Sequence, residues 1–505
     1  MTGMMKRNQV FSLLAVLLLS LSLAQSLPAL TPPGAAGGIY TRNLAVKKAF
    51  FVNFQAEWNR LGIGDTFLEL VESEPDVTQE DVSEFDKLLT VDIIGREAIL
   101  TFYADGNFFA MARPSAKKTA EIIAAIRKQM DSPQKKGGWL IEESEEDDMS
   151  VVVGVSSDTI LIASKGAADR FFAGDRGLKL PASGDLAIWL EPQPLWMYLD
   201  DPSLGLPPRA ISAIKTFSGF VDAITLDLDG VHNKSSICFD PSQDPELADI
   251  FLLDDRAWNL ADLPRGVTAT TGVIDLPALG NYLNSWAADS DTDLEIDLSA
   301  FGKRFAMIDA GNNDPQQALQ NPMGNLLFLL ETKDSLTAEV TLLSWLQMGA
   351  AFSTPEGQGG FNVEPISVNG HEGKAVQLGM AGVLYLVSYE DRLALATSKE
   401  ALKLLSAPKL ASDPDFVRLS KILPAQYISA SYGNYKKTLE QAAQLLPLMM
   451  MQSVDDAETQ QAMAELTMKL SQFFSFVAEH TGGTIGYINK KGPCLVGAGF
   501  TEVDW

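Results

Sequence analysis

One sequence unit occurs twice in this chain and limits the folds available to it. Residues 152–167 (VVGVSSDTILIASKGA) and 385–401 (YLVSYEDRLALATSKEA) each contain an apolar run, a short polar turn, a second apolar run and then Ser-Lys. Two short apolar runs around a polar turn predict a β-hairpin, and Ser is a preferred residue at the start of a helix. We therefore predict one strand–turn–strand–helix unit in two copies.

The spacing of matching residues extends this repeat. Ser164-Lys165 precedes Ser398-Lys399 by 234 residues. Four further matches share a spacing of 256 residues, namely Phe217, Phe220, Val221 and Cys238 with Phe473, Phe476, Val477 and Cys494. We attribute the difference between the two spacings to an insertion in the second half, around residues 449–468.

The remaining segments predict the content of each half. Residues 98–103 and 107–113 flank Asp105-Gly106, which predicts a hairpin, and helical apolar spacing predicts a helix over 116–130. We read residues 48–54 as a strand and place the acidic run 142–148 on a loop. The predicted fold class is α+β, with two homologous halves, each of antiparallel hairpins plus helices in repeated strand-helix-hairpin units.

The Leu-Pro pairs at Leu180, Leu263 and Leu423 give a further sign of repetition. Each pair precedes an apolar run that predicts a strand and then a predicted helix, so the order Leu-Pro, strand, helix recurs three times. The unit that begins at Lys48 has the same plan without its Leu-Pro. Chance similarity between unrelated α+β segments is the alternative explanation.

Length and the N-terminal sequence predict the domain organisation. The 505 residues exceed what one compact core usually holds. Lys6 and Arg7 precede a short apolar run at 10–24, and small residues favour cleavage after Ala24. We predict a signal peptide at 1–24, a flexible lead-in at 25–39, a first α+β half at 40–245 and a second at 246–505. An uncleaved N-terminal anchor is the alternative.

The same segment predicts the location of the protein. No Cys follows the apolar run, so we expect an exported protein that is not a lipoprotein, either periplasmic or extracellular. No later stretch is long and apolar enough to span a membrane after signal cleavage. The formal charge of −26 repels phosphate backbones, which disfavours nucleic-acid partners. The expected partner is an envelope protein, a peptide or a lipid.

One acidic segment is a candidate calcium site. Asp289, Asp291, Asp293 and Asp297 have the spacing of the first ligands in a calcium-binding loop. Leu294 stands where such a loop has Gly, and Ala300 stands where it has its closing Glu. A solvated acidic loop is the alternative, and the sequence indicates no cofactor.

The two cysteines, Cys238 and Cys494, allow one disulfide after export. They occupy matching places in the predicted halves. A bridge forms if the halves pack about a twofold axis that passes nearby; otherwise each thiol is a small buried residue in its own half. The second arrangement is the expectation from the sequence, and the bridge stays open as the alternative.

No catalytic set emerges from the titratable residues. His232, His371 and His480 lie in predicted turns or at a helix end and lack metal-ligand spacing. Ser115 and Lys118 fit the Ser-x-x-Lys pattern of penicillin-binding enzymes, but the Lys-Thr-Gly strand of those enzymes is missing. We therefore predict no catalytic residue.

The sequence around residues 396–439 carries a family resemblance. A hairpin that ends in Ala-Thr-Ser-Lys-Glu-Ala (396–401) is followed by Leu423-Pro424, an apolar strand and a helix up to Leu439. This pattern resembles a bacterial family of exported proteins catalogued only as a domain of unknown function, best over residues 263–500. The resemblance implies an envelope or extracellular location and carries over no site residue.

These observations predict a non-enzymatic exported protein with a binding or structural role in the bacterial cell envelope. The alternative is an exported hydrolase that uses carboxylates alone, since Asp and Glu are abundant. Two carboxylates that converge in a cleft would favour the hydrolase. An open apolar groove would favour binding, and an acidic face without a pocket would favour a structural role.

Overall fold

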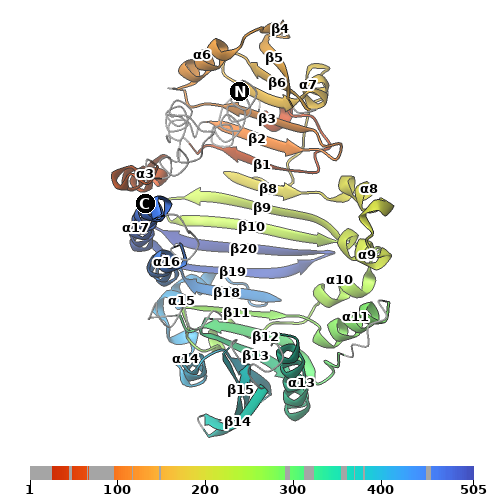
Figure 1. The fold of residues 1–505 in the computed structure, drawn as a ribbon, viewed down its shortest axis with the longest axis vertical. Helices are drawn as coiled ribbons and strands as arrows, with labels where there is room; N and C mark the ends of the chain where they lie inside the picture. Colours follow the sequence, from red (N-terminus) through yellow and green to blue (C-terminus); the bar gives the residue numbers. More distant parts are fainter. Residues whose placement is uncertain are drawn as a thin grey trace.

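The computed structural model describes residues 26–44, 48–64, 66, 96–116, 118–146, 149–289, 296–311, 324–353, 361–368, 370–378, 382–389, 391–450 and 457–504. Within them lie thirteen α-helices and one antiparallel sheet of twenty strands. Figure 1 shows the strands stacked along the long axis of the molecule. The predicted α+β class with antiparallel pairing is thus confirmed.

The strands fall into two runs of ten along the chain. The first run is β1 (Gly37–Arg42), β2 (Glu97–Phe102), β3 (Phe108–Arg113), β4 (Gln134–Lys136), β5 (Trp139–Glu146), β6 (Met149–Val155), β7 (Ile160–Ser164), β8 (Leu186–Leu190), β9 (Phe217–Asp227) and β10 (Gly230–Phe239). The second run is β11 (Thr268–Val273), β12 (Phe301–Asp309), β13 (Leu326–Thr332), β14 (Phe361–Val368), β15 (His371–Leu378), β16 (Val383–Tyr389), β17 (Arg392–Ala396), β18 (Ser429–Asn434), β19 (Thr481–Lys491) and β20 (Cys494–Val503).

The two runs pair internally in the same order. From one edge to the middle the sheet reads β4-β5-β6-β7-β3-β2-β1-β8-β9-β10. From the other edge it reads β14-β15-β16-β17-β13-β12-β11-β18-β19-β20. Strands β10 and β20 pair with each other and join the two runs. Each strand of the first run therefore has a positional counterpart ten strands later.

Apart from the first, which precedes β1, the described helices lie in the connections between these strands. They are α2 (Leu27–Leu30), α3 (Lys48–Leu61), α6 (Thr119–Gln129), α7 (Lys165–Phe172), α8 (Trp196–Leu199), α9 (Pro208–Thr216), α10 (Pro245–Phe251), α11 (Leu276–Asp289), α13 (Ser335–Ser353), α14 (Lys399–Lys403), α15 (Pro414–Leu419), α16 (Tyr435–Met450) and α17 (Ala457–Glu479). Helices α6 and α13 occupy corresponding connections, after β3 and after β13. None of the described helices is long and apolar enough to cross a membrane.

The twice-occurring unit folds as predicted. In the first copy β6 pairs with β7, and α7 follows; in the second β16 pairs with β17, and α14 follows. Ser398 caps α14 by accepting a hydrogen bond from the Ala401 N–H at 3.0 Å. Ser164 instead bonds Asn107 Oδ1 at 2.6 Å. The same dipeptide thus starts both helices, but only one Ser caps its helix.

Two local predictions were wrong. Residues 48–54 begin helix α3 rather than a strand, and that helix packs on α17 through Trp58 and Phe473, whose ring centroids are 5.3 Å apart. The acidic run from Glu142 lies in β5 up to Glu146, where it pairs with β6 instead of forming a loop. In both cases a neighbouring element selected the conformation, which local propensity alone does not report.

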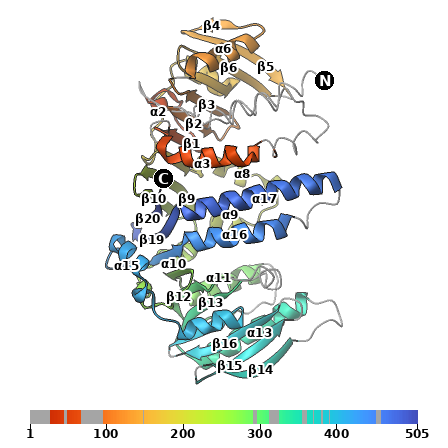
Figure 2. The same cartoon turned by 90° about the vertical axis from the view of Figure 1, so that its left-hand side faces the viewer.

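The two faces of the sheet are covered differently. One face, here called the core face, carries buried side chains such as Tyr40, Trp189 and Tyr432 and is covered by α2 and α7 in the first run and by α14 and α15 in the second. On the opposite face, here called the open face, α6 packs over the outer strands of the first run and α13 over those of the second. The sheet bends toward this open side, from which α3, α16 and α17 project (Figure 2).

The N-terminal segment is packed, which corrects the predicted flexible lead-in at 25–39. Leu27 and Thr31 are fully buried, and Ala36 donates a backbone hydrogen bond to the Phe102 carbonyl. The Leu27 N–H donates to Glu97 Oε1 at 2.8 Å, and the Tyr40 hydroxyl donates to the same oxygen at 2.8 Å. Apolar Leu and Ala among the prolines give this segment side chains to bury, and they outweigh its Pro and Gly content.

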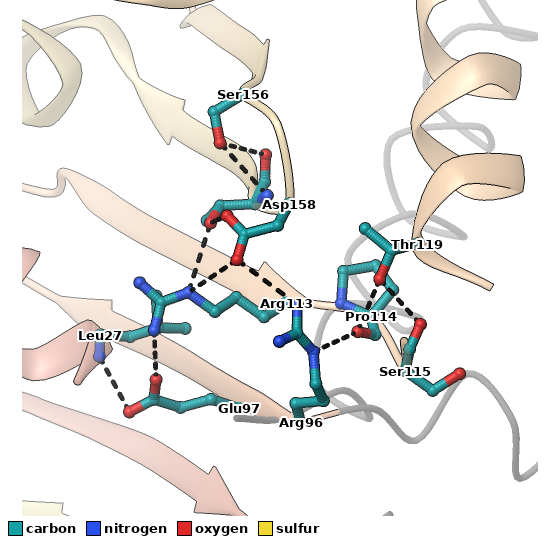
Figure 3. A network of polar contacts seen from close by, with 10 residues as sticks. Leu27, Arg96, Glu97, Arg113, Pro114, Ser115, Thr119, Ser156 and Asp158 are labelled. Carbon is teal, nitrogen blue, oxygen red and sulfur yellow. Dashed lines mark hydrogen bonds and ion pairs between the residues drawn. The ribbon is translucent and has the colours of Figure 1, made fainter. Parts of the chain in front are cut away.

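A buried ion pair completes this anchor (Figure 3). Arg113 Nη1 donates to Glu97 Oε2 at 2.8 Å, and Arg113 Nε contacts Thr159 Oγ1 at 3.3 Å. Both charged side chains are about 5% exposed. Burial raises the pKa of Glu97, while hydrogen bonds from Tyr40 and Leu27 and the charge of Arg113 oppose that rise. The carboxylate therefore depends on its donors to stay ionised in the core.

We predict that Arg113→Met lowers the free energy of unfolding by about 3–5 kcal/mol, because it leaves the Glu97 carboxylate buried without its cation. Loss of the guanidinium raises the pKa of Glu97 further, so the deficit should shrink as pH falls and the carboxyl group binds a proton. Urea unfolding at several pH values measures both effects. The double variant Glu97→Gln/Arg113→Met is the control and should recover part of the loss. A loss that stays constant with pH would contradict the explanation.

Cys238 and Cys494 form a disulfide across β10 and β20, where they are directly paired. The sequence-based preference for two separate thiols was therefore wrong. The 256-residue match was also wrong, because Phe217, Phe220 and Val221 lie in strand β9 whereas Phe473, Phe476 and Val477 lie in helix α17. Strands β9 and β19 start at residues 217 and 481, and β10 and β20 start at 230 and 494, so corresponding strands are 264 residues apart rather than 256. A structural disulfide indicates an extracytoplasmic location.

We predict that Cys238→Ser/Cys494→Ser lowers the free energy of unfolding by about 3–5 kcal/mol. The bridge spans 256 residues, and closing so long a loop restricts the unfolded chain strongly. Urea unfolding of both proteins under oxidising conditions measures the difference. Reductant should destabilise the parent protein and leave the Ser variant unchanged; equal stability of the two proteins before reduction would disprove the contribution.

Candidate functional site

In the middle of the open face, the described helices lie at either end of the strands rather than across them (Figure 1). This middle part is formed by β1, β8, β9, β10, β20, β19, β18 and β11, and Figure 1 looks onto it. Directly paired residues of neighbouring strands point to the same side, so the register defines which side chains share this face. One such row runs Leu186, Ile224, Asn233, Gly499, Gly486, Ser431 and Thr270.

A hollow of about 390 Å³ lies on the second-run side of this face. Small and polar residues of five strands line it: Asn233, Ser235, Thr270, Ser429, Ala430, Ser431, Thr484, Ile485, Gly486, Tyr487, Ile488, Gly497, Ala498 and Gly499. Hydroxyl and amide groups therefore predominate among its polar side chains. The described residues of the lining include no carboxylate, histidine, cysteine, lysine or arginine.

Glycines in β20 leave the space for this lining. A Cβ atom on Gly499 would lie 2.3 Å from Asn233 Oδ1, and one on Gly497 would lie 2.8 Å from Ser235 Oγ. The side chains of β10 thus lie over the bare backbone of β20. A larger residue at Gly497 or Gly499 would displace the Ser235 or Asn233 side chain and occupy part of the hollow.

The first-run side of the open face is apolar. Leu190, Phe220 and Ile237 form a directly paired row, and Phe102 lies next to it beyond Gly37. Ile188 lies two residues before Leu190, on the same side of β8. Leu190 is 44% exposed and Phe102 49% exposed. These side chains, here called the apolar zone, lie next to the hollow, since β10 belongs to both.

Asp222 marks the boundary between the apolar zone and the hollow. It pairs with Ile188 on one side and with Ser235 on the other. Its Oδ1 atom is buried and has no hydrogen-bond partner among the described residues. Burial raises the pKa of this carboxyl group, and a hydrogen bond from the Ala223 N–H opposes the rise. A ligand that donates a hydrogen bond at this point would satisfy the carboxyl oxygen.

Corresponding positions of the two runs have opposite chemistry. The third residue of β8 is Ile188 and that of β18 is Ser431; the fourth residue of β9 is Phe220 and that of β19 is Thr484. The third residues of β1 and β11 are Ile39 and Thr270. The two runs therefore share one pairing order, but the same positions carry apolar side chains in the first run and polar side chains in the second.

Two of the four residues of the calcium candidate are outside the described residues. Asp291 and Asp293 lie there, whereas Asp289 ends helix α11 and Asp297 follows on a loop. The Asp297 carboxylate accepts hydrogen bonds from the Ser299 side chain and backbone, which lower its pKa, the backbone bond being 2.8 Å long. This contact stabilises a local turn and gives no support to an ion-binding role.

The structure brings together a donor set that the sequence search missed. The side-chain donor atoms of Asp227, Asp229 and His232 lie within 4.8 Å of one another at the β9–β10 turn. The spacing Asp-x-Asp-x-x-His on a hairpin turn was the signal in the sequence. All three side chains are at least 42% exposed, so the cluster is an open surface feature.

The other polar candidates have structural contacts. His480 Nδ1 contacts the Asp504 carbonyl oxygen at 2.9 Å, and the His371 ring lies against Tyr389. Lys118 Nζ pairs with Glu121 at 2.8 Å. Ser115 accepts backbone hydrogen bonds that start α6 through its carbonyl oxygen, not its hydroxyl.

Comparison with known proteins gives little further information. No protein-family model matches the chain, and no curated protein matches it. Solved structures of the Treponema protein TP0453 are similar to part of it: crystal form III at 12% identity and a TM-score of 0.25, over 43% of this chain and 80% of that one. Crystal form IV gives 12% identity and a TM-score of 0.23, over 42% and 79%.

We predict that Gly499→Ala lowers the free energy of unfolding by about 1–3 kcal/mol, because its Cβ atom would displace the Asn233 side chain. Replacing Asn233 by Gly in the same chain removes the clash, so the double variant should be less destabilised than the sum of the two single variants. Urea unfolding of all three proteins measures this coupling. Additive effects would show that Asn233 does not lie over Gly499.

Proposed function

We propose that the chain is an exported binding protein of the bacterial cell envelope, without enzymatic activity, and that the open face is its binding surface. The observation that carries this proposal is the hollow and the adjoining apolar zone, on strands that none of the described helices covers. Ligand sites commonly combine an apolar surface with a few polar groups that orient the ligand. The disulfide supports a location outside the cytoplasm.

The carboxylate-dependent hydrolase has weaker support. Such an enzyme needs two carboxylates close together in a cleft. The hollow has none in its lining. The described carboxyl groups whose pKa is raised are Glu97 and Asp222; Glu97 lies in the closed network of the core face, and Asp222 lies on the open face. Their separation on opposite faces favours the binding role.

We also propose that the two halves derive from duplication of one ancestral half. The identical pairing order of the two strand runs supports this origin. The hairpin β9–β10 that ends the first run and the hairpin β19–β20 that ends the second also start 264 residues apart, strand by strand. We further propose that the chain is related to the exported family of unknown function that residues 263–500 resemble. Duplication followed by divergence would explain why one half kept an apolar surface and the other a polar one.

The binding proposal predicts that Ser431→Trp reduces ligand recovery. The indole would fill the hollow, since Ser431 is exposed within its lining. Tagged protein is purified from the native envelope fraction, and bound lipids and proteins are identified by mass spectrometry. Lys234→Trp is the matched control, because Lys234 is exposed on the opposite side of β10. Recovery should fall at least fivefold only in Ser431→Trp. An empty parent protein, or equal recovery from both variants, would argue against the proposal.

A further inference from the structure

We infer that the ligand of the open face is an amphiphile with one apolar chain and a zwitterionic head group that donates hydrogen bonds. The chain would lie on the apolar zone, and the head would meet Asp222 and the hollow. This inference rests on the proposed function and names its ligand class. Three independent features of the face carry it, namely its apolar area, its unsatisfied carboxyl oxygen and its polar hollow.

The apolar zone is a contiguous area and not a set of isolated exposed residues. It crosses β2, β1, β8, β9 and β10, which at about 4.8 Å between neighbours spans about 19 Å. Phe102, Leu190, Ile188 and Ile237 are each more than a third exposed along this path. Contiguous exposed apolar surface of this kind marks a binding site in soluble proteins. An alkyl chain laid across the strands would cover it.

The segment that follows β8 extends the apolar area. It contains the 3-10 helices η1 (Gln193–Leu195) and η2 (Pro202–Leu204) and helix α8, none of which has a buried side chain. Met197 is 66% exposed, and Leu204 and Leu206 are also exposed. The Tyr198 hydroxyl donates to the Ala104 carbonyl, which ties this segment to the turn after β2. The segment thus provides an apolar wall at that end of the zone.

Asp222 selects for a head group that donates hydrogen bonds. It is the acidic side chain in the row Ile39, Ile188, Asp222, Ser235, Gly497, at the position where apolar residues give way to polar ones. Its buried Oδ1 lacks a donor among the described residues. An ammonium N–H group at this point would satisfy it, whereas a trimethylammonium group offers no N–H.

The hollow suits the rest of such a head. Ser429, Ser431, Thr270 and Thr484 provide hydroxyl groups, and Asn233 provides an amide, so donors and acceptors are both present. Its volume of about 390 Å³ is within the range of small-ligand sites. No lysine or arginine is among the described residues that line it, and the chain has a formal charge of −26. A head with net negative charge is therefore disfavoured relative to a zwitterionic one.

The test uses equilibrium dialysis of the full exported chain with single-chain lysophospholipids of equal chain length, below their critical micelle concentrations. The probes are lysophosphatidylethanolamine, which has N–H donors, lysophosphatidylcholine, which has none, and lysophosphatidylglycerol, which is anionic. Glycerophosphoethanolamine is the head without the chain. We expect saturable binding of the ethanolamine probe, at least fivefold weaker binding of the other two lysolipids and no detectable binding of the head alone.

Three variants assign the two parts of the ligand. Leu190→Asn should weaken all lysolipids by at least tenfold, since Leu190 is 44% exposed within the apolar zone. Asp222→Asn should abolish the preference for ethanolamine over choline while retaining binding of both. Lys234→Trp, on the opposite side of β10, should change nothing. Circular dichroism and urea unfolding establish that each variant is folded.

Three outcomes would overturn the inference: no lysolipid binds, binding is unaffected by both Leu190→Asn and Asp222→Asn, or the parent protein binds the ethanolamine and choline probes equally. If lysolipids fail but a protein or peptide is recovered from the envelope in a Ser431-dependent manner, the proposed binding function stands and the amphiphile is wrong. If neither is found, the binding function itself fails.

Discussion

The pairing of β10 with β20 is the constraint on which the whole architecture depends. Nine residue pairs, from Gly230 with Glu502 to Cys238 with Cys494, join two ten-strand runs that otherwise pair only within themselves. This seam makes one twenty-stranded sheet, and the disulfide closes it at one end. It also places the apolar zone of one run beside the polar hollow of the other, because β10 contributes side chains to both. The composite face does not exist in either run alone.

Local sequence patterns predicted much of this fold. The paired hairpins at β6–β7 and β16–β17, and the strands after Leu180, Leu263 and Leu423, follow from apolar runs and turn residues. The prediction of a strand at residues 48–54 was wrong because their aromatic side chains suit a strand as well as a helix. The helix packs through Trp58 against Phe473, a residue far away in the sequence. Long-range packing of this kind leaves no periodic trace in the sequence.

The open face was harder to predict than the fold. Its residues come from strands far apart in the chain, and their neighbours depend on register rather than on spacing. Gly497 and Gly499 look like ordinary turn or strand residues until Asn233 and Ser235 are seen lying over them. The disulfide was misjudged for the same reason: equivalent places in two halves suggested separate strands, whereas the cysteines lie at opposite ends of corresponding strands, at the end of β10 and the start of β20.

Folding alone does not account for the asymmetry of the open face. The two runs have the same pairing order, so the same positions face the same side of the sheet in each. If this surface met only water, selection for solubility would favour polar residues in both runs. Instead Ile188 and Phe220 occupy positions where the other run has Ser431 and Thr484. Exposed apolar groups carry a solubility cost and gain nothing for the core, since Trp189 already fills the core face of β8. A ligand with one apolar and one polar end is the simplest partner for such a surface.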